Sequence, residues 1–221
     1  MLQQDYNSIV KSCAPAQMLA VSKLQPEEKI RLLYSQGQRA FAENYVQEAL
    51  TKQKNLEGLS DIQWHLIGHL QKNKAKLVAG QFALIHSIDS LELAQVLNRH
   101  CAQKNVTQNI LLQINVANED SKEGFTLTAL RRLWPELLTL SNLSIQGLMT
   151  MPPLTETGAE VRPYFKQLCQ LRDELKKTAP PQHPMKELSM GTSHDYRVAI
   201  EEGATIVRLG TILFGERPTA R

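Results

Sequence analysis

Eight short apolar segments recur along the chain, and most of them are followed by a longer polar stretch with helical periodicity. Strands that alternate with helices in this way pair in parallel and are buried on both faces. The segments cover residues 18–22, 39–42, 63–67, 82–88, 110–116, 144–149, 187–190 and 204–209. Eight such units in 221 residues predict an α/β fold, a single closed (β/α)8 TIM barrel over residues 1–221.

A doubly wound open sheet is the alternative fold. Nucleotide-binding sheets of that kind carry a GxGxxG turn after the first strand, and this chain has none there. No linker rich in glycine or serine divides the chain, so one domain is expected. The one irregular insert, residues 152–162 after the sixth segment, is predicted to be a mobile loop.

The intervening stretches predict helices over residues 26–36, 90–103, 127–140, 163–177 and 193–202. Ser90 is a candidate N-cap, because its hydroxyl can accept a hydrogen bond from a free N–H of the first turn. Pro135 predicts a bend or break in the third of these helices. Gly203 is placed to end the last one in a left-handed conformation.

Composition narrows the class of protein. Hydrophobic residues make up 42% and charged residues 21%, as in ordinary globular domains. A net charge of +3 is too small to indicate nucleic-acid binding. No apolar stretch is long enough for a membrane span, and residues 1–17 lack the apolar core of a secretory signal. Three cysteines without a CxxC pair are expected to be reduced thiols in a cytoplasmic protein.

A metal site is not predicted from the histidines. His65 and His69 are four residues apart but lack the glutamate of an HExxH motif, and they follow a strand rather than lie on a helix. Two interpretations of His65 are possible: it is a hydrogen-bonded group near a cofactor pocket, or it is a packed side chain beside Trp64.

Ligands in such barrels bind at the carboxyl ends of the strands, and the loops after the last two strands are rich in small and hydroxyl residues. Ser193 comes before one predicted helix, and Gly210 and Thr211 open another. Free N–H groups at two helix N-termini would form a phosphate site. Helix capping alone also explains these residues, since Thr192 and Asp195 have the spacing of a capping box.

Lys23 ends the first predicted strand, where a barrel would direct its amine into the mouth. An amine in that position can form a Schiff base with an aldehyde. A lysine beside a phosphate site is what pyridoxal phosphate (PLP) requires, whereas a solvated surface lysine is the simpler reading.

Several segments together make the chain resemble the pyridoxal phosphate homeostasis protein family, which is similar to the barrel domain of alanine racemase standing alone. They lie in the family's order along nearly the whole chain. The segments are LAVSK (19–23), AENYVQE (42–48), WHLIGHLQKNK (64–74), IHSID (85–89), SKEGF (121–125), GLMTMPP (147–153), LSMGTSHD (188–195) and VRLGTILFG (207–215).

The resemblance implies that PLP is the cofactor and that Lys23 holds it as a lysine aldimine. It also implies that Ser193 and the backbone of Gly210 and Thr211 hold the phosphate.

The remaining cofactor-binding residues follow from the same resemblance. Arg208 would face the pyridine nitrogen, and Ser189 and Gly191 would shape the phosphate loop. Asn44 and Met149 would line the ring pocket.

Three features depart from the family pattern. Ala42 stands where many relatives have glycine, and His194 stands where an acidic residue is common. The lead before Met18 is only 17 residues long, which trims the family's usual N-terminal helix and leaves its packing open.

The expected role is a carrier and regulator rather than an enzyme. A cationic arginine at the pyridine nitrogen keeps that nitrogen unprotonated, so the ring is a poor electron sink. Racemisation also needs a second acid or base, which alanine racemase takes from a second domain, and no segment is left here to form one. We therefore expect a monomer without catalytic residues that serves intracellular vitamin B6 and amino-acid homeostasis, with PLP-dependent apoenzymes as partners. The alternative is a low-activity PLP-dependent amino-acid racemase.

Overall fold

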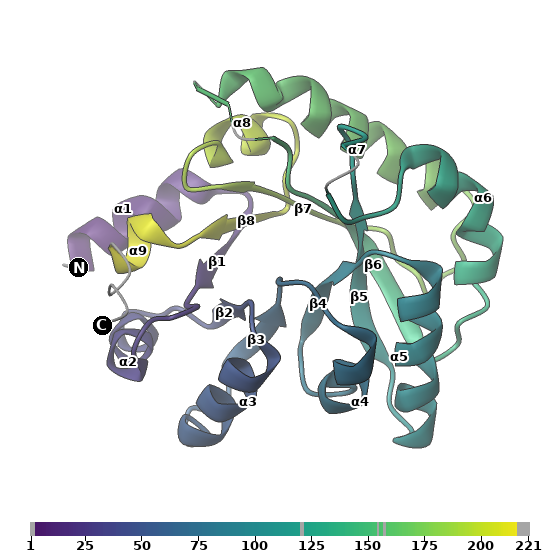
Figure 1. The fold of residues 1–221 in the computed structure, drawn as a ribbon. Helices are drawn as coiled ribbons and strands as arrows, with labels where there is room; N and C mark the ends of the chain where they lie inside the picture. Colours follow the sequence, from purple (N-terminus) through teal and green to yellow (C-terminus); the bar gives the residue numbers. More distant parts are fainter. Residues whose placement is uncertain (1–2, 120–121, 154, 157, 216–221) are drawn as a thin grey trace.

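The computed structural model describes residues 3–119, 122–153, 155–156 and 158–215. Its eight strands are all parallel and close into a barrel in sequence order, with β1 paired to both β2 and β8 (Figure 1). The predicted barrel is therefore confirmed, and the open sheet is wrong. The strands are β1 (Gln17–Val21), β2 (Ala40–Glu43), β3 (Gln63–Leu66), β4 (Leu84–Ile88), β5 (Gln108–Ile114), β6 (Leu143–Thr150), β7 (Glu187–Thr192) and β8 (Ile206–Leu209).

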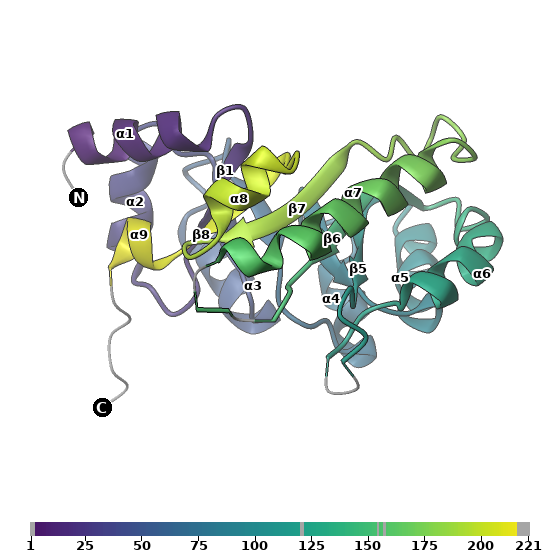
Figure 2. The same ribbon diagram turned by 90° about the horizontal axis from the view of Figure 1, so that it is seen from above.

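The helices lie around the outside of this barrel (Figures 1 and 2). They are α1 (Gln3–Cys13), α2 (Glu27–Ser35), α3 (Val46–Asn55), α4 (Ala75–Val78), α5 (Leu91–Gln103), α6 (Leu127–Leu137), α7 (Arg162–Lys176), α8 (Tyr196–Glu201) and α9 (Thr211–Phe214), with 3-10 turns at Lys72–Lys74 and Ala159–Val161. Within the described ranges, none of these helices has both the length and the apolar character needed to cross a bilayer.

Most predicted helix ends agree with the structure. The Ser90 hydroxyl caps α5 by accepting from the Leu93 N–H at 3.3 Å. Gly203 follows α8 with a φ of 92°, a conformation that strains most other residues. Pro135 does not break α6 but lies inside it, and the helix ends at Leu137, three residues before the predicted end.

The predicted start of α8 is wrong by three residues. The Asp195 carboxylate accepts from the backbone N–H of Thr192 at 2.6 Å and from its hydroxyl at 3.0 Å. These bonds fold residues 192–195 into a turn, so the helix begins at Tyr196. Of the two hydrogen bonds of the predicted capping box, the one from the Thr192 N–H to the Asp195 carboxylate forms. Thr192 does not cap the helix, because Asp195 occupies the N-cap position.

The N-terminal lead forms helix α1 in spite of its short length. Tyr6 on this helix is 5% exposed, and its hydroxyl donates to Gln38 Oε1 at 2.9 Å. The open question about its packing is thereby answered. The insert after β6 contains the 3-10 turn Ala159–Val161, while Leu154 and Thr157 of that insert lie outside the described residues. The mobility of the insert stays a prediction.

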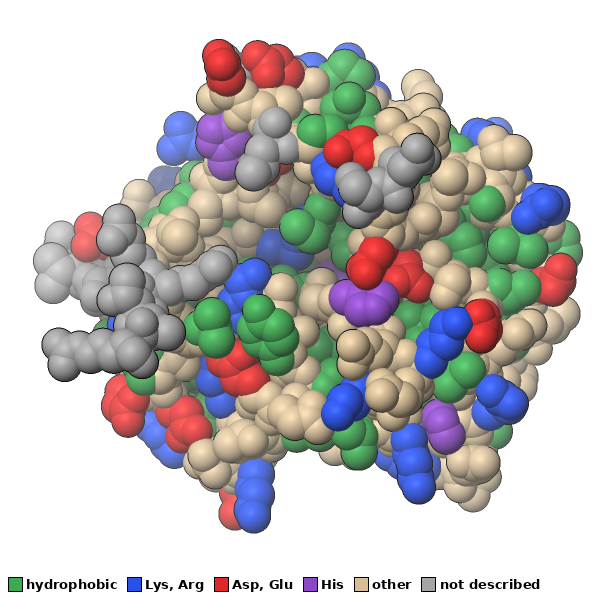
Figure 3. Space-filling model, in the orientation of Figure 1, with side chains coloured by type: hydrophobic (Ala, Val, Ile, Leu, Met, Phe, Trp, Pro, Cys, Tyr) green, Lys and Arg blue, Asp and Glu red, His purple; other side chains and the backbone are tan. Residues whose placement is uncertain are grey.

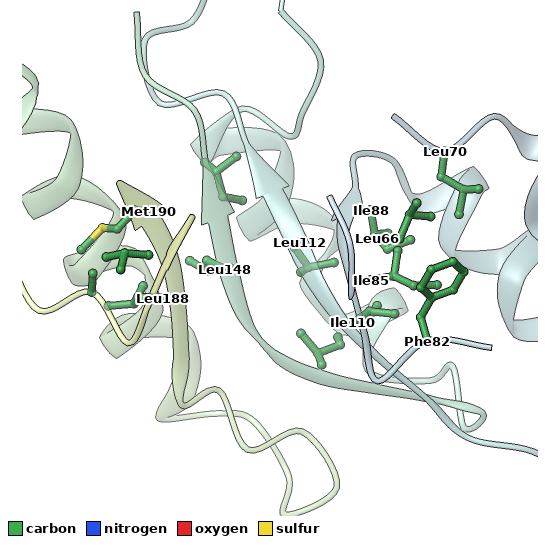
Figure 4. Close-up of a cluster of buried hydrophobic side chains, with 14 of the residues drawn as sticks. Leu66, Leu70, Phe82, Ile85, Ile88, Ile110, Leu112, Leu148, Leu188 and Met190 are labelled. Atoms are coloured by element: carbon green, nitrogen blue, oxygen red, sulfur yellow. The ribbon is translucent and has the colours of Figure 1, made fainter. Parts of the chain in front are cut away.

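Two apolar clusters hold the fold together. The larger one lies between the strands and the surrounding helices, and Figure 4 shows part of it along β3 to β7. The smaller one fills the inside of the barrel. Its seven buried members come from six of the strands and are Leu19, Ala40, Ala42, Leu84, Leu111, Met149 and Ile206.

The barrel interior changes from apolar to polar toward the carboxyl ends of the strands. Because residues two apart on a strand share a face, Leu84 on β4 is followed inward by His86, and Ile206 on β8 is followed by Arg208. Both polar side chains are buried. The apolar cluster thus forms a closed floor, above which charged and hydrogen-bonding groups face the mouth of the barrel.

Candidate functional site

The mouth of the barrel brings three of the predicted loops together. Lys23 follows β1 and lines a cavity of about 20 Å³ with Gly210 and Thr211 from the end of β8. Ser193, after β7, accepts a hydrogen bond from the Gly210 N–H at 3.4 Å. The predicted amine and the predicted phosphate-binding groups therefore meet at one place, although their sequence positions are far apart.

Two charged side chains of α3 fix the backbone on both sides of Lys23. The Lys52 ammonium on α3 donates to the Ser22 carbonyl at 2.7 Å. On the other side, the Leu24 N–H donates to Glu48 Oε1 at 2.6 Å, and Leu24 has a φ of 58°. Lys52 also donates to Glu48 at 2.7 Å. The cofactor lysine predicted from the sequence thus sits on a loop held by two side chains of one helix.

Glu43 at the end of β2 completes this group. It is fully buried, accepts from the Ser22 hydroxyl at 2.6 Å and forms an ion pair with Lys52 at 2.9 Å. Burial raises the pKa of the Glu43 carboxyl, while the hydrogen bonds from Ser22 and Lys52 oppose the rise. Removing one member of such a buried pair leaves an uncompensated charge, which is strongly destabilising.

Sequence reasoning missed the role of this group. Glu43 and Glu48 both lie in the AENYVQE segment, and Lys52 follows Glu48 by four residues, a spacing that pairs side chains on a helix. That spacing was a usable signal. The contacts of Lys52 and Glu48 with residues 22–24 left no such signal in the sequence, because they join separate strand–helix units.

Arg208 lies inside the barrel beneath this mouth. Its Nη1 donates to the Ser189 carbonyl at 2.8 Å and to the Ser189 hydroxyl at 2.7 Å, and its Nη2 donates to the Thr150 carbonyl at 2.8 Å. Burial lowers the pKa of Arg208 to about 10, which the charge of Asp195 opposes, so the side chain stays a cation near neutral pH. A guanidinium has five N–H groups, and two remain here without an acceptor among the described residues.

Ser189 and Gly191 support the site rather than line its cavity. The Ser189 side chain is fully buried against Arg208. Gly191 has a φ of 90°, and a Cβ there would lie 2.6 Å from the Ala199 Cβ on α8. Glycine is therefore needed for β7 to approach α8 closely enough to present Ser193.

Asn44 and Met149 lie apart from the cavity beside Lys23. Met149 is 1% exposed and belongs to the apolar floor. Asn44 lines a neighbouring hollow of about 350 Å³ with Gly68 and Lys74. The Asn44 Oδ1 is buried, and no described residue donates to it. That unpaired acceptor marks a place where a ligand could donate a hydrogen bond.

The two histidines of the HxxxH spacing point to different places. His65 is a buried, hydrogen-bonded group of the barrel interior: its Nδ1 lies 2.9 Å from His86 Nε2, and His86 Nδ1 lies 2.9 Å from the Ser189 hydroxyl. His69 is half-exposed at the mouth. His65 is therefore hydrogen-bonded, as the first interpretation expects, and its nearness to a cofactor pocket stays a prediction.

His69 instead forms a small cluster with two carboxylates. Its Nδ1 lies 2.7 Å from Glu123 Oε2 and 3.3 Å from Asp89 Oδ2. These residue types can ligate a divalent metal ion, and their ligand atoms lie within 4.8 Å of one another. The three residues come from the loops after β3, β4 and β5, so sequence spacing did not reveal them. Figure 3 shows histidine and acidic side chains gathered on this face, beside its central hollow.

The chain matches the alanine racemase N-terminal domain family over residues 1–218. The pyridoxal phosphate homeostasis protein of Aquifex aeolicus is 46% identical over 202 residues, which cover 91% of this chain and 87% of the relative. That of Synechocystis is 40% identical over 213 residues, covering 96% and 97%. The chain belongs to the pyridoxal phosphate homeostasis protein family.

Solved structures agree with this membership. PipY of Synechococcus elongatus without PLP matches with a TM-score of 0.92 at 41% identity, covering 97% of this chain and all of PipY. PipY with PLP bound matches with a TM-score of 0.89 at 40% identity and the same coverage. Alanine racemase from Bartonella henselae shares the fold at a TM-score of 0.71 and 17% identity, with 98% of this chain matched to 60% of that one.

The buried histidines should make stability depend on pH. Burial lowers the pKa of His65 to about 4 and that of His86 well below its ordinary value of about 6.5. Below pH 6.5 the unfolded chain therefore binds protons that the folded chain does not. The free energy of unfolding is expected to fall from about pH 6.5 toward pH 4, by up to about 1.4 kcal/mol per pH unit for each such histidine.

Urea denaturation of the wild type and of His65→Asn between pH 7.5 and 4.5 measures this dependence. The variant should lose less stability over that interval, whereas His100→Asn on α5, outside the barrel, should behave as the wild type. Equal slopes for His65→Asn and the wild type would contradict the assignment of His65 as a buried neutral group.

Proposed function

We propose that this protein binds PLP at the mouth of the barrel and serves as a carrier and regulator of that cofactor. The observation that carries the proposal is the meeting of Lys23 with Ser193, Gly210 and Thr211. The membership of this chain in the pyridoxal phosphate homeostasis protein family supports the proposal. The match to PipY, whose structure has been solved with PLP bound, supports it as well.

The residues present fit the chemical groups of PLP. The Thr211 N–H and the Ser193 hydroxyl suit a phosphate, and the Gly210 N–H, which donates to Ser193 at 3.4 Å, lies beside them. The two N–H groups of Arg208 without a protein acceptor suit the lone pair of the pyridine nitrogen. The unpaired Asn44 Oδ1 would accept from a ring hydroxyl. The Lys23 amine would condense with the aldehyde, forming the C=N bond of an aldimine and releasing the carbonyl oxygen as water.

The charge of Arg208 and the composition of the cavity favour holding the cofactor over catalysis. A permanent cation cannot lend a proton to the pyridine nitrogen, so the ring withdraws electrons weakly. Among the described residues that line the small hollow beside Lys23, no other side chain titrates, and the titratable cluster of His69, Asp89 and Glu123 lies elsewhere at the mouth. Racemisation would need a second acid or base on the opposite face of the substrate.

We further propose that reversible loading and release of PLP serves vitamin B6 and amino-acid homeostasis in the cytoplasm. On this proposal the protein acts as a monomer, and PLP-dependent apoenzymes receive the cofactor. The exposed position of the mouth supports exchange of the cofactor with free amines (Figure 3). A low-activity racemase is the alternative that catalytic assays must exclude.

Cofactor binding is tested by absorbance after addition of PLP to the wild type, Lys23→Ala and Lys74→Ala. Lys74 lines the neighbouring hollow and serves as the matched control. The wild type and Lys74→Ala should show a band near the violet edge of the visible that borohydride abolishes, and Lys23→Ala should lack it. The same band in Lys23→Ala would refute the role of Lys23.

Catalysis is tested by proton NMR of alanine and other amino acids in D2O with the PLP-loaded protein. A carrier should exchange the α-proton no faster than Lys23→Ala with an equal amount of PLP. Exchange that depends on Lys23 and turns over many times would establish the racemase-type alternative.

A further inference from the structure

Four buried side chains form a continuous line of hydrogen bonds across the inside of the barrel. Arg208 on β8 contacts Ser189 on β7, which contacts His86 on β4, which contacts His65 on β3. The three links measure 2.7, 2.9 and 2.9 Å. All four side chains are buried, with exposed fractions of 4% or less. We call this line the Arg208–His65 chain.

The chemistry of arginine fixes the direction of every bond in the chain. A guanidinium only donates, so the Ser189 oxygen accepts from Arg208. The Ser189 hydroxyl proton then needs its own acceptor, and His86 Nδ1 is the one that the described residues offer. A buried hydroxyl without an acceptor would cost free energy, so Nδ1 of His86 must be unprotonated.

The directions of the remaining bonds, from His86 to His65, follow in the same way. A neutral imidazole with an unprotonated Nδ1 carries its proton on Nε2, and His86 Nε2 lies 2.9 Å from His65 Nδ1. His65 Nδ1 therefore accepts, and its own proton also lies on Nε2. Burial lowers the pKa of both rings, and the charge of Arg208 lowers that of His86 further, which agrees with two neutral imidazoles.

We propose that His86 and His65 are positioning residues that act through Ser189 to hold the Arg208 guanidinium in a fixed orientation toward the bound cofactor. By accepting the hydrogen bond from the Ser189 hydroxyl, His86 Nδ1 turns a Ser189 lone pair toward Arg208. The guanidinium is then held on one side by Ser189 and on the other by the Thr150 carbonyl. Its remaining N–H groups are left in a single orientation.

The direction of the chain can be tested without any cofactor. Nitrogen-15 NMR of the histidine-labelled protein distinguishes the two neutral tautomers and the charged form. His86 and His65 should both be neutral with the proton on Nε2, from pH 7.5 down to pH 5.5. A proton on Nδ1 of His86, or protonation of either ring near pH 6.5, would overturn the proposal, whether or not the protein binds PLP.

The effect on the site rests on the proposed function and is tested with His86→Phe, His86→Asn and His183→Phe. His183 is a matched buried histidine outside the chain that accepts from the Ile145 N–H. His86→Phe should shift the absorption of bound PLP and weaken its binding roughly tenfold, as expected for loss of one buried hydrogen bond. His86→Asn, whose Oδ1 can replace the Nδ1 acceptor, should restore both properties.

The control separates positioning from general destabilisation. His183→Phe should lower the melting temperature but leave the absorption and affinity of PLP unchanged. If His86→Phe behaves like His183→Phe, His86 is merely a packed side chain. If His86→Phe does not fold, the comparison of His86→Asn with the wild type and the tautomer measurement still decide the proposal.

Discussion

A buried guanidinium inside the barrel is the constraint on which the upper interior depends. Arg208 is 4% exposed and remains a cation, so its charge must be met by hydrogen bonds rather than by water. Carbonyl groups of β6 and β7 and the Ser189 hydroxyl supply them. Once that oxygen accepts from Arg208, the Ser189 hydroxyl donates to His86 Nδ1, and His86 Nε2 in turn donates to His65 Nδ1. One cation thus orders side chains on three further strands, β7, β4 and β3.

A second buried cation, Lys52, plays the corresponding part beside Lys23. Lys52 joins Glu43 and Glu48 and holds the backbone of Ser22, while Glu48 holds that of Leu24. Lys23 lies between these two anchored residues. The backbone around Lys23 and the Arg208 cation are therefore both held by interactions that exist before any ligand binds. Such preorganisation reduces the ordering that binding requires.

The periodicity of the sequence was sufficient to predict the barrel, because parallel strands buried on both faces leave a strong local pattern. The barrel in turn predicted that Lys23, Ser193, Gly210 and Thr211 would meet, since carboxyl ends of parallel strands share one face. Helix ends were less accurate. The turn at Asp195 delayed α8, and Pro135 was accommodated within α6, outcomes that depend on local hydrogen bonds rather than on periodicity.

The supporting residues could not be predicted in the same way. His86 on β4 meets Ser189 on β7 only across the interior of the closed barrel, and Lys52 reaches Ser22 across two strand–helix units. Contacts of this kind leave no spacing signal in a single sequence. The assignment of Asn44 and Met149 to the ring pocket stays a prediction: Asn44 lines a hollow beside the one at Lys23, and Met149 belongs to the apolar floor beneath the mouth.

The central claim is that Lys23 is the attachment point that these interactions place. It is tested most directly by reducing the PLP-loaded protein with borohydride, digesting it and locating the phosphopyridoxyl group by mass spectrometry. We expect one stoichiometric adduct on the peptide that contains Lys23. An adduct on another lysine, or adducts spread over several lysines, would contradict this account of the site.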